Sequence, residues 1–145
     1  MTGVQTCALP IYLTQYTMAA DRQLGSLAHL NSPWQPAVLA LVKATCDGAR
    51  TAGGDPDAFG ESANRPVGVC GEAAGDPGLA VVLVGLGVNS LSMTPRSLPA
   101  VAKVLSTVTL EQAKDLAAQV LAARTSEDAV SIARANLPIL GELGL

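Results

Sequence analysis

The sequence PVGVCGEAAGDPGLAVVLVGLGVNSLSM, residues 66–93, decides the fold. Its two ends, residues 66–70 and 88–93, are short apolar runs of the kind that form buried strands. Between them lie the apolar positions of one helix face, spaced i, i+3, i+4 and i+7: Leu79, Val82, Leu83 and Leu86. This order of strand, helix and strand is typical of a βαβ unit with parallel strands.

Local signals mark where this central helix begins and ends. Asp76 followed by Pro77 is typical of an N-cap and a first helical residue, and Gly87 is typical of a helix end. The small residues 71–75 before them predict a tight turn. Similar signals, including capping boxes at residues 32–35 and 109–112, predict further helices. These helices are expected over residues 32–50, 94–105, 109–123 and 125–136.

The remaining segments carry weaker patterns. Residues 1–12 show neither helical nor strand periodicity, and residues 13–31 predict only a strand end followed by a loop. Residues 53–65 are polar and contain glycine and proline, which predicts another loop. Two or three short strands alternating with helices indicate the α/β fold class. Because a parallel sheet needs helices on both faces or closure into a barrel, either strands are missing or the fold is unusually small.

Composition excludes several classes of function. The 145 residues carry 9 Lys and Arg against 12 Asp and Glu, without a basic cluster, which argues against nucleic acid as a partner. No apolar run reaches the roughly 20 residues that span a bilayer, so no membrane insertion is expected. Cys7, Cys46 and Cys70 form no CxxC motif and indicate neither a disulfide framework nor a zinc site. With no secretory signal visible, these features favour a cytoplasmic location.

Cys70 is the first candidate functional residue. It ends the apolar run of residues 66–70, and ligands of parallel α/β folds bind at that end of the strands. A thiol there can act as a nucleophile or a proton donor. A free cysteine is also among the most buried residue types, and Cys46, on an apolar helix face, is expected to lie in the core. With no partner histidine in the pattern, both interpretations of Cys70 stay open.

A second candidate is the pair Asp21-Arg22, at the end of the stretch LTQYTMAADR. A guanidinium binds a carboxylate or phosphate through two parallel hydrogen bonds, so Arg22 is a candidate for holding an anionic substrate. Composition alone favours the simpler interpretation, an ion pair on the surface. His29 is the single histidine of the chain, and one histidine cannot form a metal site by itself.

Four stretches occur together in an order that resembles a known family. They are LTQYTMAADR from Leu13, SPWQPAVLALV from Ser32, VGVCGEAAGDP from Val67 and VLVGLGVNSLSMTPRSLPAV from Val82. They resemble the C-terminal part of enzyme I, the phosphoenolpyruvate–protein phosphotransferase of the bacterial sugar phosphotransferase system. The resemblance covers about residues 13–130, apart from residues 54–64, which look like an insertion. The CGE motif alone also resembles pyruvate phosphate dikinase and phosphoenolpyruvate synthase, so a fragment of either enzyme is an alternative.

The resemblance implies the C-terminal part of a (β/α)8 TIM barrel, truncated, that binds phosphoenolpyruvate and Mg²⁺. It implies that Cys70 ends the seventh strand and protonates the enolate of pyruvate, and that Arg22 binds the phosphate of phosphoenolpyruvate. In the family the phosphoryl group passes to a histidine and on to the phosphocarrier protein HPr for sugar uptake. The family forms homodimers through this domain, so a non-catalytic dimerisation module made of residues 97–136 is a further alternative.

The sequence departs from the family at several positions. The family has an Asn-Asp pair, for substrate and Mg²⁺, immediately before Leu-Thr-Gln-Tyr. Ile11 and Tyr12 stand at these positions, so no metal-ligating residue is expected in this chain. Gln23 replaces the usual glycine after the arginine. His29 resembles a loop histidine of the family and not its phosphate acceptor.

Residues 1–12 resemble the translated read-through of a sequencing adaptor, so they are expected not to belong to the natural protein. The expected organisation is this segment, the C-terminal portion of the phosphoenolpyruvate-binding barrel at residues 13–136, and a tail at residues 137–145. Because metal ligands and the phosphate-accepting histidine are missing, we expect the chain by itself to be inactive. We also expect it to fold poorly, since its strands leave unpaired edges.

Overall fold

Three parallel strands form the sheet of the protein, whose computed structural model describes residues 6–8, 10–21, 23–51 and 65–145. The strands lie in the order β1 (Thr6–Ala8), β2 (Val67–Cys70) and β3 (Ser90–Ser92). β2 is central and pairs in parallel with both neighbours. The expected βαβ unit is confirmed, and β1 is a strand in a segment where the pattern predicted none.

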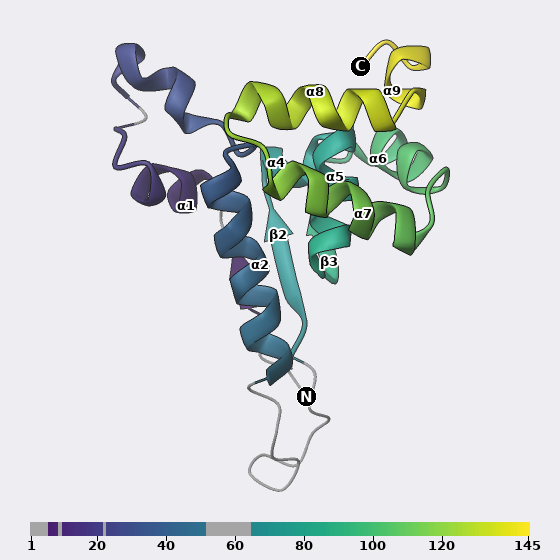
Figure 1. Cartoon of the computed structure of the whole chain (residues 1–145), viewed down its shortest axis with the longest axis horizontal. Helices are drawn as coiled ribbons and strands as arrows, with labels where there is room; N and C mark the ends of the chain where they lie inside the picture. The colour runs from purple at the N-terminus through teal and green to yellow at the C-terminus, as the bar shows by residue number, and fades with distance from the viewer. Residues whose placement is uncertain (1–5, 9, 22, 52–64) are drawn as a thin grey trace, which may run out of the picture.

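Helices surround this sheet and continue beyond it (Figure 1). The short helices are α1 (Pro10–Thr17), the 3₁₀ helix η1 (Gly25–Asn31), α4 (Glu72–Gly75), α6 (Leu98–Leu105) and α9 (Ile139–Glu142). The longer helices are α2 (Pro36–Thr51), α5 (Pro77–Leu86), α7 (Leu110–Leu121) and α8 (Ser126–Asn136). In Figure 1, α2 runs alongside β2, and α2 also contacts α5 and α7, which pack with α8.

Helix α5 is the centre of the molecule, because it contacts α2, α4, α6, α7 and α8. Residues 79–83 are all at most 1% exposed, so the helix is buried on every side rather than on the single face that the spacing predicted. The predicted ends are confirmed. The side chain of Asp76 accepts hydrogen bonds from the N–H groups of Gly78 and Leu79, and Gly87 ends the helix in the left-handed conformation.

Helices α5 and α7 pack closely at Gly85. A Cβ atom placed on Gly85 would lie 2.1 Å from the carbonyl oxygen of Ala113. The two helix backbones therefore approach so closely that only a glycine fits at this position. The capping box that begins α7 is present as predicted, since Thr109 and Gln112 each bond the backbone N–H of the other.

Several predicted boundaries are wrong, and local hydrogen bonding explains two of them. Helix α2 begins at Pro36 rather than at residue 32, because Ser32 Oγ accepts from the N–H of Trp34, which holds a turn instead. Helix α6 begins at Leu98, because residues 94–97 close a turn through a backbone bond of 3.0 Å. The helix expected over residues 94–105 is therefore shorter at its start.

The remaining differences between prediction and structure concern short helices with few buried residues. Helices α1 and η1 occupy the region predicted as a strand end and loop, α4 replaces the predicted turn of residues 71–75, and α9 lies in the predicted tail. η1 buries no residue and α1 buries only Pro10 and Thr14, so neither presents an apolar face that a sequence pattern reveals. The loop predicted at residues 53–65 falls almost wholly outside the described residues.

The α/β class is confirmed, but the sheet has three strands and is open within the described ranges, so the (β/α)8 barrel of which the resemblance implies a truncated part is not seen there. Among the helices that the structure describes, none is long and apolar enough to cross a membrane.

Candidate functional site

A glycine turn directs the chain away from the sheet at the carboxyl end of β2. Cys70 is the last residue of β2 and is half-buried. The N–H of Gly71 donates to the carbonyl of Ser92 on β3 at 3.0 Å, and Gly71 has a φ of +89°, a conformation that favours glycine. The chain then enters α4 at once. Cys70 therefore stands at the strand end, where the sequence placed it.

A cavity of about 260 Å³ opens beside Cys70. Its described lining comes from α1, the η1–α2 connection and the β2–α4 turn: Pro10, Ile11, Thr14, Asn31, Pro33, Cys70, Gly71, Glu72 and Ala73. Binding sites of parallel α/β folds lie outside the carboxyl ends of the strands, which is where this cavity lies. It is the candidate functional site.

Two side chains of this cavity have no hydrogen-bond partner among the described residues. They are the hydroxyl of Thr14 and the carboxamide of Asn31, whose oxygen and nitrogen are both buried. Thr14 is only 2% exposed. A buried polar group left unpaired destabilises a protein by about 1–3 kcal/mol, so such groups are rare. Thr14 lies in a stretch that the sequence singled out, whereas no sequence signal pointed to Asn31.

The other predicted site residues are dispersed. Ile11 lines the cavity, and Tyr12, the next residue, is 47% exposed. Arg22 lies outside the described residues, so its predicted contact with a phosphate or with Asp21 falls outside them as well. His29 is exposed on η1. The structure therefore brings Cys70 and Ile11 to one cavity.

Cys46 provides an internal contrast to Cys70. It lies on α2, is 2% exposed and belongs to the apolar core, as the sequence predicted. Burial raises the pKa of the Cys46 thiol above its ordinary value, and the nearby carboxylate of Asp47 raises it further. Since the thiolate is the reactive form, this raised pKa and the burial of the side chain both lower the reactivity of Cys46.

A hydrogen bond joins Trp34, which follows the cavity residue Pro33, to Asp76. Indole Nε1 of Trp34 donates to Oδ2 of Asp76 at 2.9 Å, while Oδ1 of the same carboxylate caps α5. One carboxylate thus joins the η1–α2 connection to the start of α5. This bond links segments 42 positions apart.

The cavity does not suit Mg²⁺. Hard cations take several oxygen ligands, and Glu72 supplies the one carboxylate among the described lining residues. Ile11 offers only hydrocarbon. Across the part of the chain that the structure describes, no three His, Cys, Asp or Glu side chains gather as a metal site would require.

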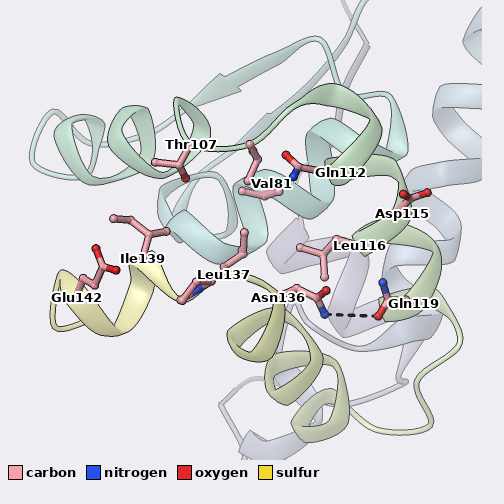
Figure 2. A pocket seen from close by; sticks show the side chains of 12 residues that line it. Val81, Thr107, Gln112, Asp115, Leu116, Gln119, Asn136, Leu137, Ile139 and Glu142 are labelled. Atoms are coloured by element: carbon pink, nitrogen blue, oxygen red, sulfur yellow. Dashed lines mark hydrogen bonds between the residues drawn. The ribbon is translucent and has the colours of Figure 1, made fainter.

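A larger hollow, of about 530 Å³, lies among α5, α7, α8 and α9 (Figure 2). Leu116, Leu137 and Ile139 give it apolar walls, and the amide of Asn136 donates to Gln119 Oε1 at 3.4 Å across it. Its described lining contains no thiol and no unpaired buried polar atom. The smaller cavity beside Cys70 is therefore the better candidate site.

Comparison with known proteins gives the family. A model described as the PEP-binding domain of PEP-utilising enzymes, where PEP is phosphoenolpyruvate, matches residues 12–110. The chain belongs to this family. The matched region includes α2, the β2–α4 turn, α5 and β3, so Cys70 lies within it, whereas Pro10 and Ile11 of the cavity precede it.

Relatives of known name agree with this family. The chain is 47% identical over 125 residues to the phosphoenolpyruvate-protein phosphotransferase of Streptomyces coelicolor, covering 86% of this chain and 20% of that protein. It is 44% identical over 115 residues to a multiphosphoryl transfer protein of Xanthomonas campestris, covering 79% of this chain and 12% of that protein. It is 36% identical over 105 residues to the Haemophilus influenzae phosphotransferase, covering 72% of this chain and 16% of that protein. The chain thus spans at most a fifth of these three relatives.

Proposed function

We propose that this chain is part of a phosphoenolpyruvate-protein phosphotransferase, enzyme I, and forms the part of its PEP-binding barrel that carries the proton donor. The observation that carries the proposal is the position of Cys70. It ends a central parallel strand, lines a cavity and lies within the matched PEP-binding domain. The names of the relatives favour this enzyme over the dikinase and the synthase.

The proposed chemistry of Cys70 follows from what PEP leaves behind. When its phosphoryl group passes to a histidine nitrogen, the bond from phosphorus to the enol oxygen breaks and the enolate of pyruvate remains. Protonation of the terminal carbon of this enolate gives pyruvate. A thiol beside that carbon acts as the general acid, and its sulfur is left as a thiolate that takes a proton from solvent.

We assign the phosphate of PEP to Arg22. A guanidinium offers two parallel N–H donors to phosphate oxygens and keeps its charge at any physiological pH. Neutralising those oxygens favours phosphoryl transfer. Arg22 belongs to the stretch that resembles the family's substrate-binding arginine, which is the support for this assignment.

Mg²⁺ supplies further charge neutralisation to PEP in enzyme I, but Ile11 and Tyr12 occupy the positions that would bind it here. No step of the proposal therefore passes through a metal. The chain also has one histidine, His29, which does not correspond to the phosphate acceptor. We propose that these 145 residues bind PEP without completing phosphoryl transfer to HPr, and PEP-dependent phosphorylation of the isolated chain would contradict this.

We place the phosphotransferase in the cytoplasm and infer that it forms homodimers through the helical layer. Leu98 on α6 and Leu110 on α7 are each more than half exposed, which supports a role for this layer in association. Sedimentation equilibrium of the chain tests the inference. Charged substitutions at these two leucines are expected to weaken a dimer, and a monomer at every concentration would contradict it.

Protection of Cys70 from alkylation tests the central proposal. PEP is expected to slow the reaction of iodoacetamide with Cys70 in the folded chain, and inorganic phosphate is the control for general ionic effects. Arg22→Ala is expected to remove the protection, since the phosphate loses its cation. An alkylation rate at Cys70 that PEP leaves unchanged in the folded chain would overturn the proposed function.

A further inference from the structure

The hollow of about 530 Å³ in Figure 2, which we name the α7–α9 groove, has an apolar floor. Val81, Leu116 and Leu137 line it from separate elements, and each is at most 3% exposed. Ile139 of α9 adds a partly buried wall. Ligand pockets are typically hollows of roughly 300–1,000 Å³ with mostly apolar walls and a few polar groups. The α7–α9 groove therefore has the size and the lining of a site for a small organic molecule.

Two carboxylates stand on opposite sides of this floor. Figure 2 shows Asp115 of α7 on one side and Glu142 of α9 on the other. The apolar side chains of Leu116, Leu137 and Ile139 lie between them. Neither carboxylate forms an ion pair with a described residue. Both are therefore available to a cation that enters the groove.

The lysines and arginines of the chain leave this groove negatively charged. None of them lines it among the described residues, and Lys114 on α7 and Arg134 on α8 bond other groups. Arg22 is the one such residue outside the described ranges. Its neighbours Asp21 and Gln23 belong to the α1–η1 connection, at the opposite side of the molecule from α9 in Figure 1. The charge of the groove is thus set by its two carboxylates.

Neutral side chains of the groove add hydrogen-bond acceptors. The N–H groups of Asn136 donate to the carbonyl of Ile132 at 2.9 Å and to Gln119 Oε1 at 3.4 Å, which leaves Asn136 Oδ1 as an acceptor. The hydroxyl of Thr107 donates to a backbone carbonyl, so its lone pairs remain as well. The side-chain nitrogens of Gln112 and Gln119 are the neutral donors of the same lining. An ammonium group, which has three N–H donors and no acceptor, matches the carboxylates and these acceptors.

We propose that the α7–α9 groove binds an aliphatic diamine, with one ammonium group at Asp115 and the other at Glu142. The methylene chain lies over Leu116 and Leu137, and each ammonium group donates to one carboxylate. A monoamine satisfies only one of the two carboxylates, and both of them repel an anion. Alkyl amines keep their charge at pH 7. The proposal stands on the groove and its charges, and it does not rest on the proposed phosphotransferase activity.

Titration of the folded chain with 1,6-diaminohexane, followed by two-dimensional NMR of the backbone amides, tests the proposal. Hexylamine and 1-hexanol are matched probes, since they have the same carbon chain with one ammonium group and with none. The diamine should bind about threefold more tightly than hexylamine, because it forms one more exposed ion pair. The amide shifts should be largest in α7 and α9. Equal affinities of the three probes would overturn the proposal.

The length of the diamine tests the apolar floor. Burial of methylene groups favours binding, so 1,6-diaminohexane should bind about fivefold more tightly than 1,3-diaminopropane. Equal affinities of the two diamines would mean adventitious ion pairing at exposed carboxylates only, and would overturn the proposal.

Isosteric variants test the two carboxylates. Asp115→Asn and Glu142→Gln change exposed side chains, and each should weaken binding of 1,6-diaminohexane by about threefold without changing that of 1-hexanol. The controls are Asp128→Asn on α8 and Glu111→Gln on α7, which make the same chemical changes to exposed residues outside the groove. These controls should leave the affinity unchanged. An affinity that neither groove variant alters would overturn the proposal.

Protein concentration separates the diamine from a second copy of the chain as the occupant. An affinity for 1,6-diaminohexane that is independent of protein concentration supports the proposal. An affinity that falls as the protein concentration rises would mean that a second copy covers the groove, and would overturn it. Protection of Cys70 by PEP is measured at another site, so either result with the diamine leaves the phosphotransferase proposal unchanged.

Discussion

The α5–α7 helix pair and the corner around Cys70, where α1, the end of η1 and the β2–α4 turn meet, differ in how completely their side chains pack. In the pair, residues 79–83 are buried on all sides and Gly85 lets two backbones touch. At the corner, segments from three separate parts of the chain surround a cavity in which three buried polar atoms have no partner among the described residues. The comparison teaches that the helix pair supplies stability, whereas the corner retains unsatisfied groups that a ligand can use.

The strongest way to break the helix pair is to fill the contact at Gly85. Gly85→Ala places a Cβ 2.1 Å from the carbonyl oxygen of Ala113, and backbone cannot move aside as a side chain can. The free energy of unfolding should fall by about 3 kcal/mol in urea titrations. Gly48→Ala on α2 is the matched control, since its Cβ meets nothing within 4 Å, and it should raise stability by about 0.5–1 kcal/mol. Equal effects of the two variants would show that the close contact is not required.

The second change acts on the carboxylate that joins the two regions. Asp76→Ala removes the cap of α5 and the bond to Trp34, so stability should fall by about 2 kcal/mol. Trp34→Phe removes the indole donor alone and should lower stability by about 1 kcal/mol. Asp115→Ala, on the exposed surface of α7, is the control and should change stability by less than about 0.5 kcal/mol. Asp76→Ala with the stability of the control would contradict this role.

The third prediction concerns the pH dependence of stability that the buried thiol of Cys46 should produce. Burial raises the pKa of Cys46 in the folded chain, so the folded state keeps its proton at a pH where the unfolded state loses it. This contribution to stability is complete below the ordinary thiol pKa of about 8.5 and is lost as pH rises above that value. Urea titrations between pH 7 and 10 should show the decline, and Cys46→Val should flatten it. An unchanged slope in Cys46→Val would assign the decline to other groups.

The smallest effect on the free energy of unfolding is expected from a change to Asp47 on the outer surface of α2. A hydrogen bond from Lys43, and secondly one from Arg50, lowers the pKa of Asp47. A lowered folded-state pKa means that stability is present above the ordinary carboxyl pKa and is lost as pH falls through the lowered value. Asp47→Asn should therefore lower stability slightly at pH 7 and not at pH 2. The difference should be close to the error of the titration because the groups are exposed, and a large effect would show that α2 depends on this ion pair.

Sequence patterns predicted the helix pair far better than the corner. α5, α7 and α8 begin where Asp76, Thr109 and Thr125 predicted, because each cap bonds backbone groups within three residues of itself. α1 and η1 were missed, because they bury few or no residues and carry no apolar face. Part of the site followed from the pattern, since Cys70 ends an apolar run. Its surroundings did not, because the burial of Thr14 and Asn31 beside it depends on how three segments pack.

The order of strands and helices, the caps of the central helices and the strand-end position of Cys70 follow from the chain's own local chemistry. Each depends on side chains that lie within a few residues of one another, so the interaction can be predicted from the sequence by itself. The approach of α7 to Gly85, the cavity and its unpaired atoms come from tertiary packing alone. They depend on the distance between segments far apart in the chain, and this distance is decided only when the whole core packs.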